Sequence, residues 1–297
     1  VITGMHRSAT SMLAEWAVRA GATLGEGPLF DVDAANPRGL YERRDVVAFN
    51  DAWLTDFGGA WWAPPHVPDT AWSGLDDHRL ERDRTRLDLF TAGPGQVVKD
   101  PRLSLLLPVW DRLSLRRLPV VIAVRQPRAV AMSLHVRNGM SLRRGLSLWV
   151  AYNRALFKRV AEREALVLDV DRALANPVAA GEALCNFLQA AGVPMTDPRQ
   201  VVADVEPRLL RQGAAPLPGY AEGLAAGLDE MTGELRALHG RTGKDLPNPV
   251  GVPDWAAETL AELSQTWSLQ ERARRAEEAV SGPATPSAWS RLRSRLS

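Results

Sequence analysis

Short apolar runs alternate with stretches of helical periodicity through the first two thirds of the chain. The runs that we expect to form strands are residues 1–3, 96–98, 119–124 and 165–170. The stretches with helical spacing are residues 12–20, 129–136, 142–163 and 178–191. Strands that alternate with helices are typical of a parallel sheet covered by helices on both faces. The pattern therefore predicts an α/β fold.

The pattern changes beyond about Pro207. Two breaks rich in proline and glycine follow, at residues 214–219 and 246–253, and residues 259–280 are charged with helical character. The last stretch, residues 281–297, is rich in proline, serine and arginine. We expect an α/β domain over residues 1–212 and, over residues 213–297, a helical appendage that ends in a flexible tail.

Composition narrows the function classes. The 297 residues, 45% of them hydrophobic, are enough to bury a sizeable core, and a net charge of +1 gives no general attraction to nucleic acid or anionic membranes. The single cysteine, Cys185, excludes an intrachain disulfide and favours the cytoplasm. The sequence contains no run of about eighteen apolar residues, so we expect no membrane-spanning helix. Because the chain begins inside a predicted strand, a leading methionine or targeting segment could have been trimmed.

The first loop carries the strongest chemical signal. Residues 4–11 read Gly-Met-His-Arg-Ser-Ala-Thr-Ser between the first strand and the first helix. Backbone N–H groups at a helix N-terminus favour an anion, the hydroxyls add donors, and Arg7 adds a permanent charge. The loop lacks the GxxxxGK[ST] spacing, so the anion is not expected to be an ordinary Mg-ATP tail. A plain helix N-cap is the alternative.

Two further motifs follow strands in the same way. They are Lys99-Asp100-Pro101-Arg102, after residues 96–98, and Arg125-Gln126-Pro127, after residues 119–124. Ligands of parallel sheets bind at the carboxyl ends of the strands. We therefore expect both motifs to lie beside the first loop.

Together with Ser133, these three motifs resemble the sulfotransferase family, particularly its bacterial members. Residues 36–42 (Asn-Pro-Arg-Gly-Leu-Tyr-Glu) and 170–177 (Val-Asp-Arg-Ala-Leu-Ala-Asn-Pro) extend the resemblance over about residues 1–212. The second of these elements departs from the family by Val170 in place of tyrosine and Asp171 in place of glutamate. The resemblance implies a P-loop-like sheet and the sulfuryl donor 3′-phosphoadenosine 5′-phosphosulfate (PAPS), which leaves as adenosine 3′,5′-bisphosphate. It implies no metal.

The resemblance also implies roles for the first loop. The donor-binding residues that it implies there are His6, Arg7, Ser8, Ala9, Thr10 and Ser11. Arg7 would lie beside the bridging oxygen that becomes the leaving group, and the hydroxyls would hold the 5′-phosphate. The family usually has glycine where this chain has Ala9, so alanine would be strained if the loop needs a positive φ there. We expect His6 to be structural, packed under the loop or turned away from the anion.

Arg125 and Ser133 resemble the pair that grips the 3′-phosphate, the group that distinguishes PAPS from ATP. The alternative is that Arg125 caps the strand edge or forms an ion pair, while Ser133 is a small helix-packing residue. Arg137 and Arg143 are further candidates for contacts with the nucleotide phosphates.

Sulfuryl transfer needs in-line geometry, neutralisation of charge on the moving group, and a base for the incoming hydroxyl. Our first choice for the base is Glu42, with Glu26 and Asp100 as runners-up. The alternative for Glu42 is a helix-start carboxylate that pairs with one of the two arginines after it. Lys99 could stabilise the sulfuryl oxygens or simply pair with Asp100.

Residues 51–86 contain four tryptophans, Trp53, Trp61, Trp62 and Trp72, in a stretch that we expect to be loop-like. Indole faces suit stacking on sugar rings or phenols, so the expected acceptor is a hydroxyl of a carbohydrate or another small molecule. The alternative is that the indoles fill a subdomain core.

Two other function classes remain open. A P-loop kinase or nucleotide triphosphatase would use residues 166–169, Leu-Val-Leu-Asp, as a Walker-B-like strand, but the first loop lacks the lysine it needs. The other class is a non-catalytic protein that binds a glycan or a partner on the same fold.

Overall fold

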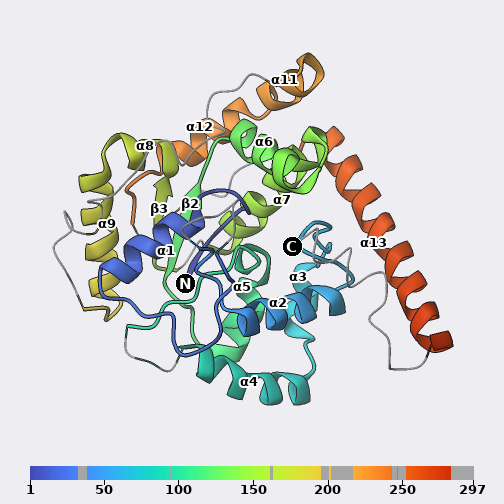
Figure 1. Cartoon of the computed structure of the whole chain (residues 1–297), viewed down its shortest axis with the longest axis horizontal. Helices are drawn as coiled ribbons and strands as arrows, with labels where there is room; N and C mark the ends of the chain where they lie inside the picture. The colour runs from blue at the N-terminus through green and yellow to red at the C-terminus, as the bar shows by residue number, and fades with distance from the viewer. Residues whose placement is uncertain are drawn as a thin grey trace.

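The computed structural model describes residues 1–32, 39–91, 93, 95–160, 163–194, 201, 217–242, 246 and 252–281. Helices greatly outnumber strands in it (Figure 1). In chain order the elements are β1 (Ile2–Gly4), α1 (Thr10–Arg19), α2 (Arg44–Asp56), α3 (Asp69–Ser73), α4 (Asp77–Thr91), α5 (Leu103–Ser114), β2 (Val120–Val124), α6 (Pro127–Asn138), α7 (Leu142–Val160), β3 (Ala165–Asp169), α8 (Val170–Ala175), α9 (Pro177–Ala190), α11 (Gly219–Ala226), α12 (Asp229–Ala237) and α13 (Asp254–Ser281).

The three strands form one parallel sheet in the order β1-β2-β3. Ile2 pairs with Val121, and the pairing of β2 with β3 ends at Val124 and Asp169. The strand expected at residues 96–98 occurs only as two isolated parallel bridges, Gln96 with Thr23 and Lys99 with Ile2, the latter on the outer side of β1. The Ile2 N–H donates to the Val98 carbonyl over 2.8 Å. Lys99 thus lies at the edge of the sheet, next to β1.

Helices cover both faces of this sheet, as the apolar pattern predicts. The side chains of β2 point alternately to the two sides: Val121 and Ala123 pack with α1 and α9, whereas Val120, Ile122 and Val124 pack with α5 and α7. Figure 1 shows α9 and α7 on opposite sides of the strands. Because every residue of β2 is buried, its sequence is a continuous apolar run.

The expectation of a loop-like stretch at residues 51–86 is wrong. The stretch contains the end of α2, all of α3 and most of α4. The apolar pattern missed α4 because it buries few apolar side chains, Leu80, Leu87 and Phe90, within a charged sequence. The packing of these side chains against the rest of the chain stabilises the helix more than its own pattern does.

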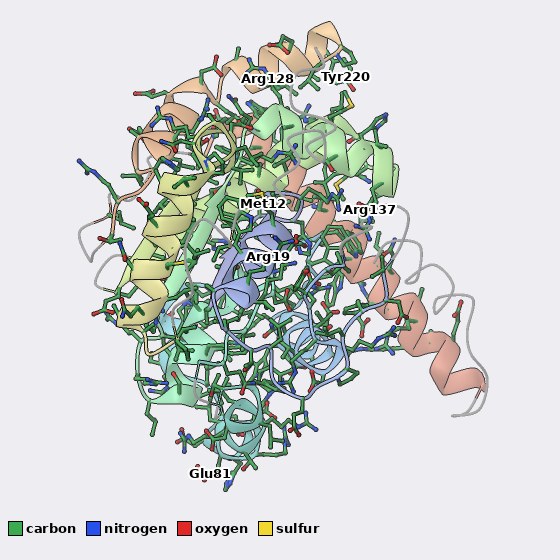
Figure 2. All side chains as sticks on the ribbon, turned by 60° about the vertical axis from the view of Figure 1, so that its left-hand side comes forward. Met12, Arg19, Glu81, Arg128, Arg137 and Tyr220 are labelled. Carbon is green, nitrogen blue, oxygen red and sulfur yellow. The ribbon has the colours of Figure 1, made fainter. Side chains whose placement is uncertain are left out.

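The described helices after residue 217 pack on the α/β part. Buried side chains of α11, α12 and α13, among them Ala225, Leu235 and Leu263, belong to the same apolar core as α7. Arg128, at the start of α6, pairs with Glu222 and Asp229 on the side of the molecule where α11 lies (Figure 2). The two-part division at residue 212 remains a prediction, and residues 282–297 lie outside the described residues.

Among the described residues, no helix combines the length and the apolar character that a membrane crossing requires.

Candidate functional site

The loop between β1 and α1 has an unusual backbone. Arg7 and Ala9 both have positive φ, 67° and 58°, and Gly4 has φ 149°. A Cβ at Gly4 would come within 2.4 Å of the Ala123 carbonyl oxygen, so the loop lies directly against β2. Ala9 is left-handed, the conformation in which alanine costs about 1–2 kcal/mol relative to a right-handed residue. The strain expected for alanine at this position is therefore present.

The N-terminus of α1 is open. Its N-cap is Ala9, which makes no side-chain cap, and its first turn contains no acidic residue. The alternative of a plain hydroxyl N-cap is therefore wrong. The N–H groups of Met12 and Leu13 donate to the Ala9 carbonyl. The positive end of the helix dipole faces the loop without a side-chain cap, as an anion site requires.

Arg125 follows β2 and is only 5% exposed. Its Nη1 donates to the Arg7 carbonyl over 2.9 Å, and its own carbonyl accepts from Trp149 Nε1, also over 2.9 Å. Its Nε and Nη2 are buried without a hydrogen-bond partner among the described residues. Burial lowers the pKa of Arg125, an effect that the charge of Asp171 opposes, yet arginine stays protonated. A buried cation with two unused donors is costly unless an anion joins it.

Ser133 brings α6 to the same place. It is 4% exposed on α6, and Arg7 Nε donates to its Oγ over 2.8 Å. Arg7 is therefore bonded through its backbone to Arg125 and through its side chain to Ser133. The structure thus brings together the first loop and the third motif, as the sheet edge predicts.

Lys99 joins the second motif to the loop. It is buried, and its Nζ pairs with Glu42 Oε1 and donates to Ser11 Oγ over 3.3 Å. The alternative pairing of Lys99 with Asp100 is therefore wrong. Ser11 Oγ in turn donates to the Leu40 carbonyl over 3.1 Å. Glu42, the candidate base, is thus linked through Lys99 to Ser11 in the first turn of α1.

The alternative partners of Glu42 are occupied elsewhere. Arg43 pairs with Asp45 over 2.6 Å, and Arg44 pairs with Asp31. The expectation that Glu42 pairs with one of these arginines is therefore wrong. Residues 36–38 of the element that ends at Glu42 lie outside the described residues.

The two runner-up bases occupy different surroundings. Asp100 is fully buried, and both of its carboxylate oxygens accept hydrogen bonds, one from Asn50 Nδ2 and the other from Arg102. Glu26 is exposed, between two glycines that pack against Arg43. Neither geometry resembles that of Glu42, which is buried beside the loop.

His6 packs under the loop, as expected. Its ring centroid lies 4.6 Å from that of Trp61 and 5.5 Å from that of Tyr152, and Tyr152 Oη donates to the Trp61 carbonyl over 2.8 Å. Burial above all, then the charges of Arg102 and Lys99, lower the pKa of His6 well below 6.5. The imidazole is neutral at physiological pH.

The tryptophans divide between the core and the surroundings of the loop. Trp53 is buried, with the Arg79 guanidinium 3.7 Å from its ring centroid. Trp72 packs edge-on against Phe57 at 5.0 Å. Trp61 contacts His6 and is buried in the same apolar core as Trp53, and Trp62 and Trp72 pack against that core partly buried. Core filling therefore accounts for Trp53 and Trp61, and an acceptor role for the indoles remains a prediction.

Other predicted phosphate ligands are placed differently. Arg143 donates to Thr259 Oγ1 over 2.7 Å and pairs with Glu258, so it contacts α13. Arg137 lies one turn after Ser133 on α6, and its charge contributes to the lowered pKa of His6. Of the two arginines, only Arg137 is placed near the loop.

Asp169, the acid of the Walker-B-like run, is fully buried at the end of β3. It accepts from the Arg172 N–H over 2.8 Å and pairs with Arg236. This carboxylate caps α8 and anchors α12, so both of its oxygens have protein partners.

Two residues beside the site escaped prediction, Asn50 and Trp149. Both are buried and contact motif residues far away in sequence, Asp100 and Arg125. An asparagine or tryptophan inside a helix carries no local signal of such a contact.

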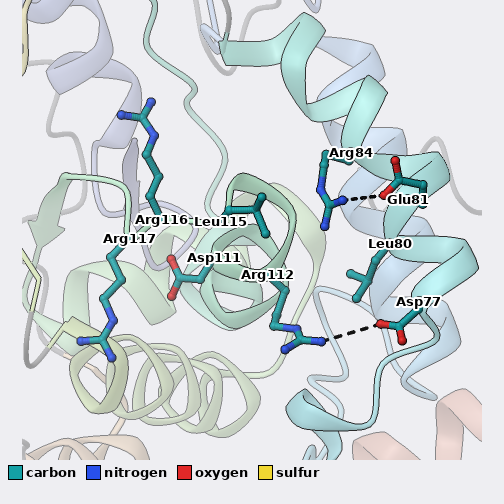
Figure 3. A pocket seen from close by; sticks show the side chains of 9 residues that line it. All are labelled: Asp77, Leu80, Glu81, Arg84, Asp111, Arg112, Leu115, Arg116 and Arg117. Carbon is teal, nitrogen blue, oxygen red and sulfur yellow. Dashed lines mark hydrogen bonds and ion pairs between the residues drawn. The ribbon is translucent and has the colours of Figure 1, made fainter.

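A cavity of about 610 Å³ lies away from this site, between α4, the end of α5 and the residues before β2. Figure 3 shows two of its arginines paired, Arg84 with Glu81 and Arg112 with Asp77. Because Arg116 and Arg117 precede β2, the cavity lies at the amino ends of the strands, opposite the loop.

Comparison with known proteins adds no assignment: no protein-family model matches the chain, and no curated protein shows a significant match.

Proposed function

We propose that the chain is a PAPS-dependent sulfotransferase of P-loop-like architecture that transfers a sulfuryl group to a hydroxyl of a carbohydrate or another small molecule. The observation that carries the proposal is the Arg125 guanidinium, buried beside Arg7 and Ser133 with two donors unused. A second phosphate on a nucleotide bound at the α1 N-terminus would supply the missing acceptors.

The donor would lie along the loop. The N–H groups at the start of α1 and the hydroxyls of Ser8 and Thr10, both buried residues of the loop, suit the 5′-phosphosulfate. Arg7 would neutralise the charge that develops on the leaving oxygen, an interaction stronger in the transition state than in the ground state. In transfer, the bond from sulfur to the bridging oxygen breaks and a bond from sulfur to the acceptor oxygen forms.

Glu42 would take the proton that the acceptor hydroxyl loses. Its carboxylate is paired with Lys99, whose ammonium also contacts Ser11 at the first turn of α1. Lys99 can therefore reach both the base and the loop that would hold the donor. As Glu42 gains the proton its attraction for Lys99 falls, and the ammonium becomes available to the sulfuryl oxygens.

The acceptor would enter beside Trp61 and Trp62, and the expected compartment is the cytoplasm. A kinase-like reaction is less well supported, because the carboxylate of Asp169 is occupied by Arg172 and Arg236.

Calorimetry tests the donor site without knowledge of the acceptor. We expect adenosine 3′,5′-bisphosphate to bind at least tenfold more tightly than AMP, about 1.4 kcal/mol or more. Equal affinities would refute the proposal. Transfer of labelled sulfate from PAPS to a panel of sugars and phenols then tests catalysis, and bisphosphate binding without any transfer would favour the non-catalytic alternative.

A further inference from the structure

We infer that Asn50 and Asp100 are positioning residues that hold the Glu42–Lys99 pair in its reactive arrangement. The inference rests on the proposed function and adds to it a buried polar network around Asp100.

The network begins at the Asp100 carboxylate, which is fully buried. Its Oδ2 accepts from Asn50 Nδ2 over 2.9 Å, and its Oδ1 accepts from the Arg102 backbone N–H over 2.9 Å. Asn50 Oδ1 accepts from Trp110 Nε1 over 2.8 Å. Arg102 also donates to Asp51 Oδ1 over 2.7 Å. Within the described part of the chain, these side chains bury no polar atom without a hydrogen-bond partner. A buried network whose groups are satisfied fixes one arrangement of its members.

The same residue is tied to the sheet by its backbone. The Asp100 N–H donates to the Ile2 carbonyl over 3.3 Å, and its own carbonyl accepts from Thr3 Oγ1 over 2.9 Å. Asp100 is thus bonded to β1 through its main chain and to α2 through its side chain.

This placement connects the network to both members of the reactive pair. Lys99 directly precedes Asp100, and Glu42 lies just before α2, whose second turn carries Asn50. The hydrogen bond between Asn50 and Asp100 therefore sets where α2 lies relative to Lys99, and with it the approach of Glu42. Catalytic geometry is sensitive at this scale, since a displacement of about 1 Å can cost about 100-fold in rate.

The charges around the network have a second effect. Burial would lower the pKa of Arg102, but the charges of Asp100, Asp51 and Glu42 outweigh it and raise that pKa above its usual value. Arg102 is therefore a permanent cation among three carboxylates. Asp100 is therefore a structural counter-ion of Arg102, whereas Glu42 is the carboxylate that lies beside the loop.

A reciprocal swap of the two side chains tests the inference. In Asp100→Asn, one orientation of the new amide sets its NH₂ against Asn50 Nδ2, and the other sets it against the Arg102 donors. Asn50→Asp alone sets two carboxylates against each other. In the double variant the amide introduced at position 100 donates its NH₂ to the carboxylate introduced at position 50, and its oxygen accepts from Arg102. The other oxygen of the new carboxylate still accepts from Trp110.

We expect each single variant to lower kcat for sulfuryl transfer from PAPS by about 10- to 100-fold, with the affinity for adenosine 3′,5′-bisphosphate within about twofold of wild type. The double variant should recover kcat to within about threefold. Folded single variants with wild-type kcat would overturn the inference, and so would a double variant no better than the worse single.

A second variant covers the case in which the single variants do not fold. Trp110→Phe removes the N–H that fixes Asn50, together with part of a fully buried ring, and should lower kcat more than it changes nucleotide affinity. If it lowers the melting temperature and leaves kcat unchanged, the network is structural only and the inference fails. A wild-type protein that transfers no sulfuryl group defeats the proposed function itself, whereas normal wild-type transfer with unaffected variants defeats the inference alone.

Discussion

The sharpest prediction concerns Arg125→Met, which replaces a buried guanidinium by a shorter, unbranched apolar side chain. In the unliganded protein the guanidinium makes one hydrogen bond, from Nη1 to the Arg7 carbonyl, and buries two nitrogens that have no partner among the described residues. The substitution therefore removes one favourable contact and one unfavourable burial together.

The magnitudes decide the direction. The lost hydrogen bond is worth about 0.5–1.5 kcal/mol, or up to about 3 kcal/mol because its donor is charged. The desolvation penalty of a buried ion is several kcal/mol, and no carboxylate among the described residues is hydrogen-bonded to this guanidinium to offset it. We expect the free energy of unfolding of Arg125→Met to equal or exceed that of wild type. Most substitutions of buried residues lower the free energy of unfolding instead.

The affinity of the same variant for adenosine 3′,5′-bisphosphate should fall. Each charge-assisted hydrogen bond to the 3′-phosphate is worth about 1.5–3 kcal/mol, so the loss of two more than removes a tenfold preference. Calorimetry should show the affinity of Arg125→Met for adenosine 3′,5′-bisphosphate falling to that for AMP, with the affinity for AMP within about threefold of wild type. Arg128→Met is the matched control: Arg128 lies three residues after Arg125, at the start of α6, but pairs with Glu222 and Asp229, so both affinities should stay unchanged.

A different pair of results would refute the reasoning. If Arg125→Met lowers the melting temperature by several degrees and weakens both nucleotides equally, the guanidinium is a structural tie of the loop. The unused nitrogens would then have no bearing on the 3′-phosphate.

Substitutions in the loop and beside it should have separable effects. Arg7→Ala should lower turnover by orders of magnitude but nucleotide affinity by less than about tenfold, and EDTA should leave wild-type turnover unchanged; a requirement for Mg²⁺ would contradict this. Ala9→Gly should raise the free energy of unfolding in denaturant by up to about 1 kcal/mol, because left-handed strain of about 1–2 kcal/mol exceeds the entropic cost of glycine, and a fall would contradict it. Glu42→Gln should cut turnover by about 10²- to 10⁴-fold with donor affinity nearly unchanged, whereas the control Glu26→Gln should behave as wild type; the reverse outcome would move the base to Glu26. Because burial lowers the pKa of His6, the unfolded chain takes up the proton first as pH falls below 6.5, so stability should fall from pH 6.5 to 5 and fall less in His6→Phe, as denaturation at the two pH values can show.

The place of the candidate site could be predicted from the sequence because parallel strands carry it. The β-branched run before Arg125 and the short run before Gly4 end at the same edge of a parallel sheet, so the loops after them had to meet. Helical spacing then placed Ser133 two turns into α6, and the structure brings its hydroxyl to Arg7. These inferences needed only strand direction and helix period.

The partners of the charged residues could not be predicted in this way. Lys99 pairs with Glu42 rather than with its chain neighbour because α2 packs against the turn at residues 99–102. Charges next to a carboxylate in the sequence did not indicate its ion-pair partner. Arg43, for example, follows Glu42 but pairs with Asp45. Side-chain pairing depends on how elements pack, and the apolar pattern of this region indicated neither α4 nor its contacts.

Three unfavourable structural features occur together at the first loop. Ala9 is left-handed, α1 begins without a side-chain cap, and Arg125 buries a charge with unused donors. Each feature costs free energy in the unliganded protein, and each has a separate structural explanation when considered alone. An anion bound at the loop would relieve two of them directly, the uncapped start of α1 and the buried cation. The left-handed residue would then turn the chain around that anion. Such costs gather at functional sites because only there is the ligand present to offset them.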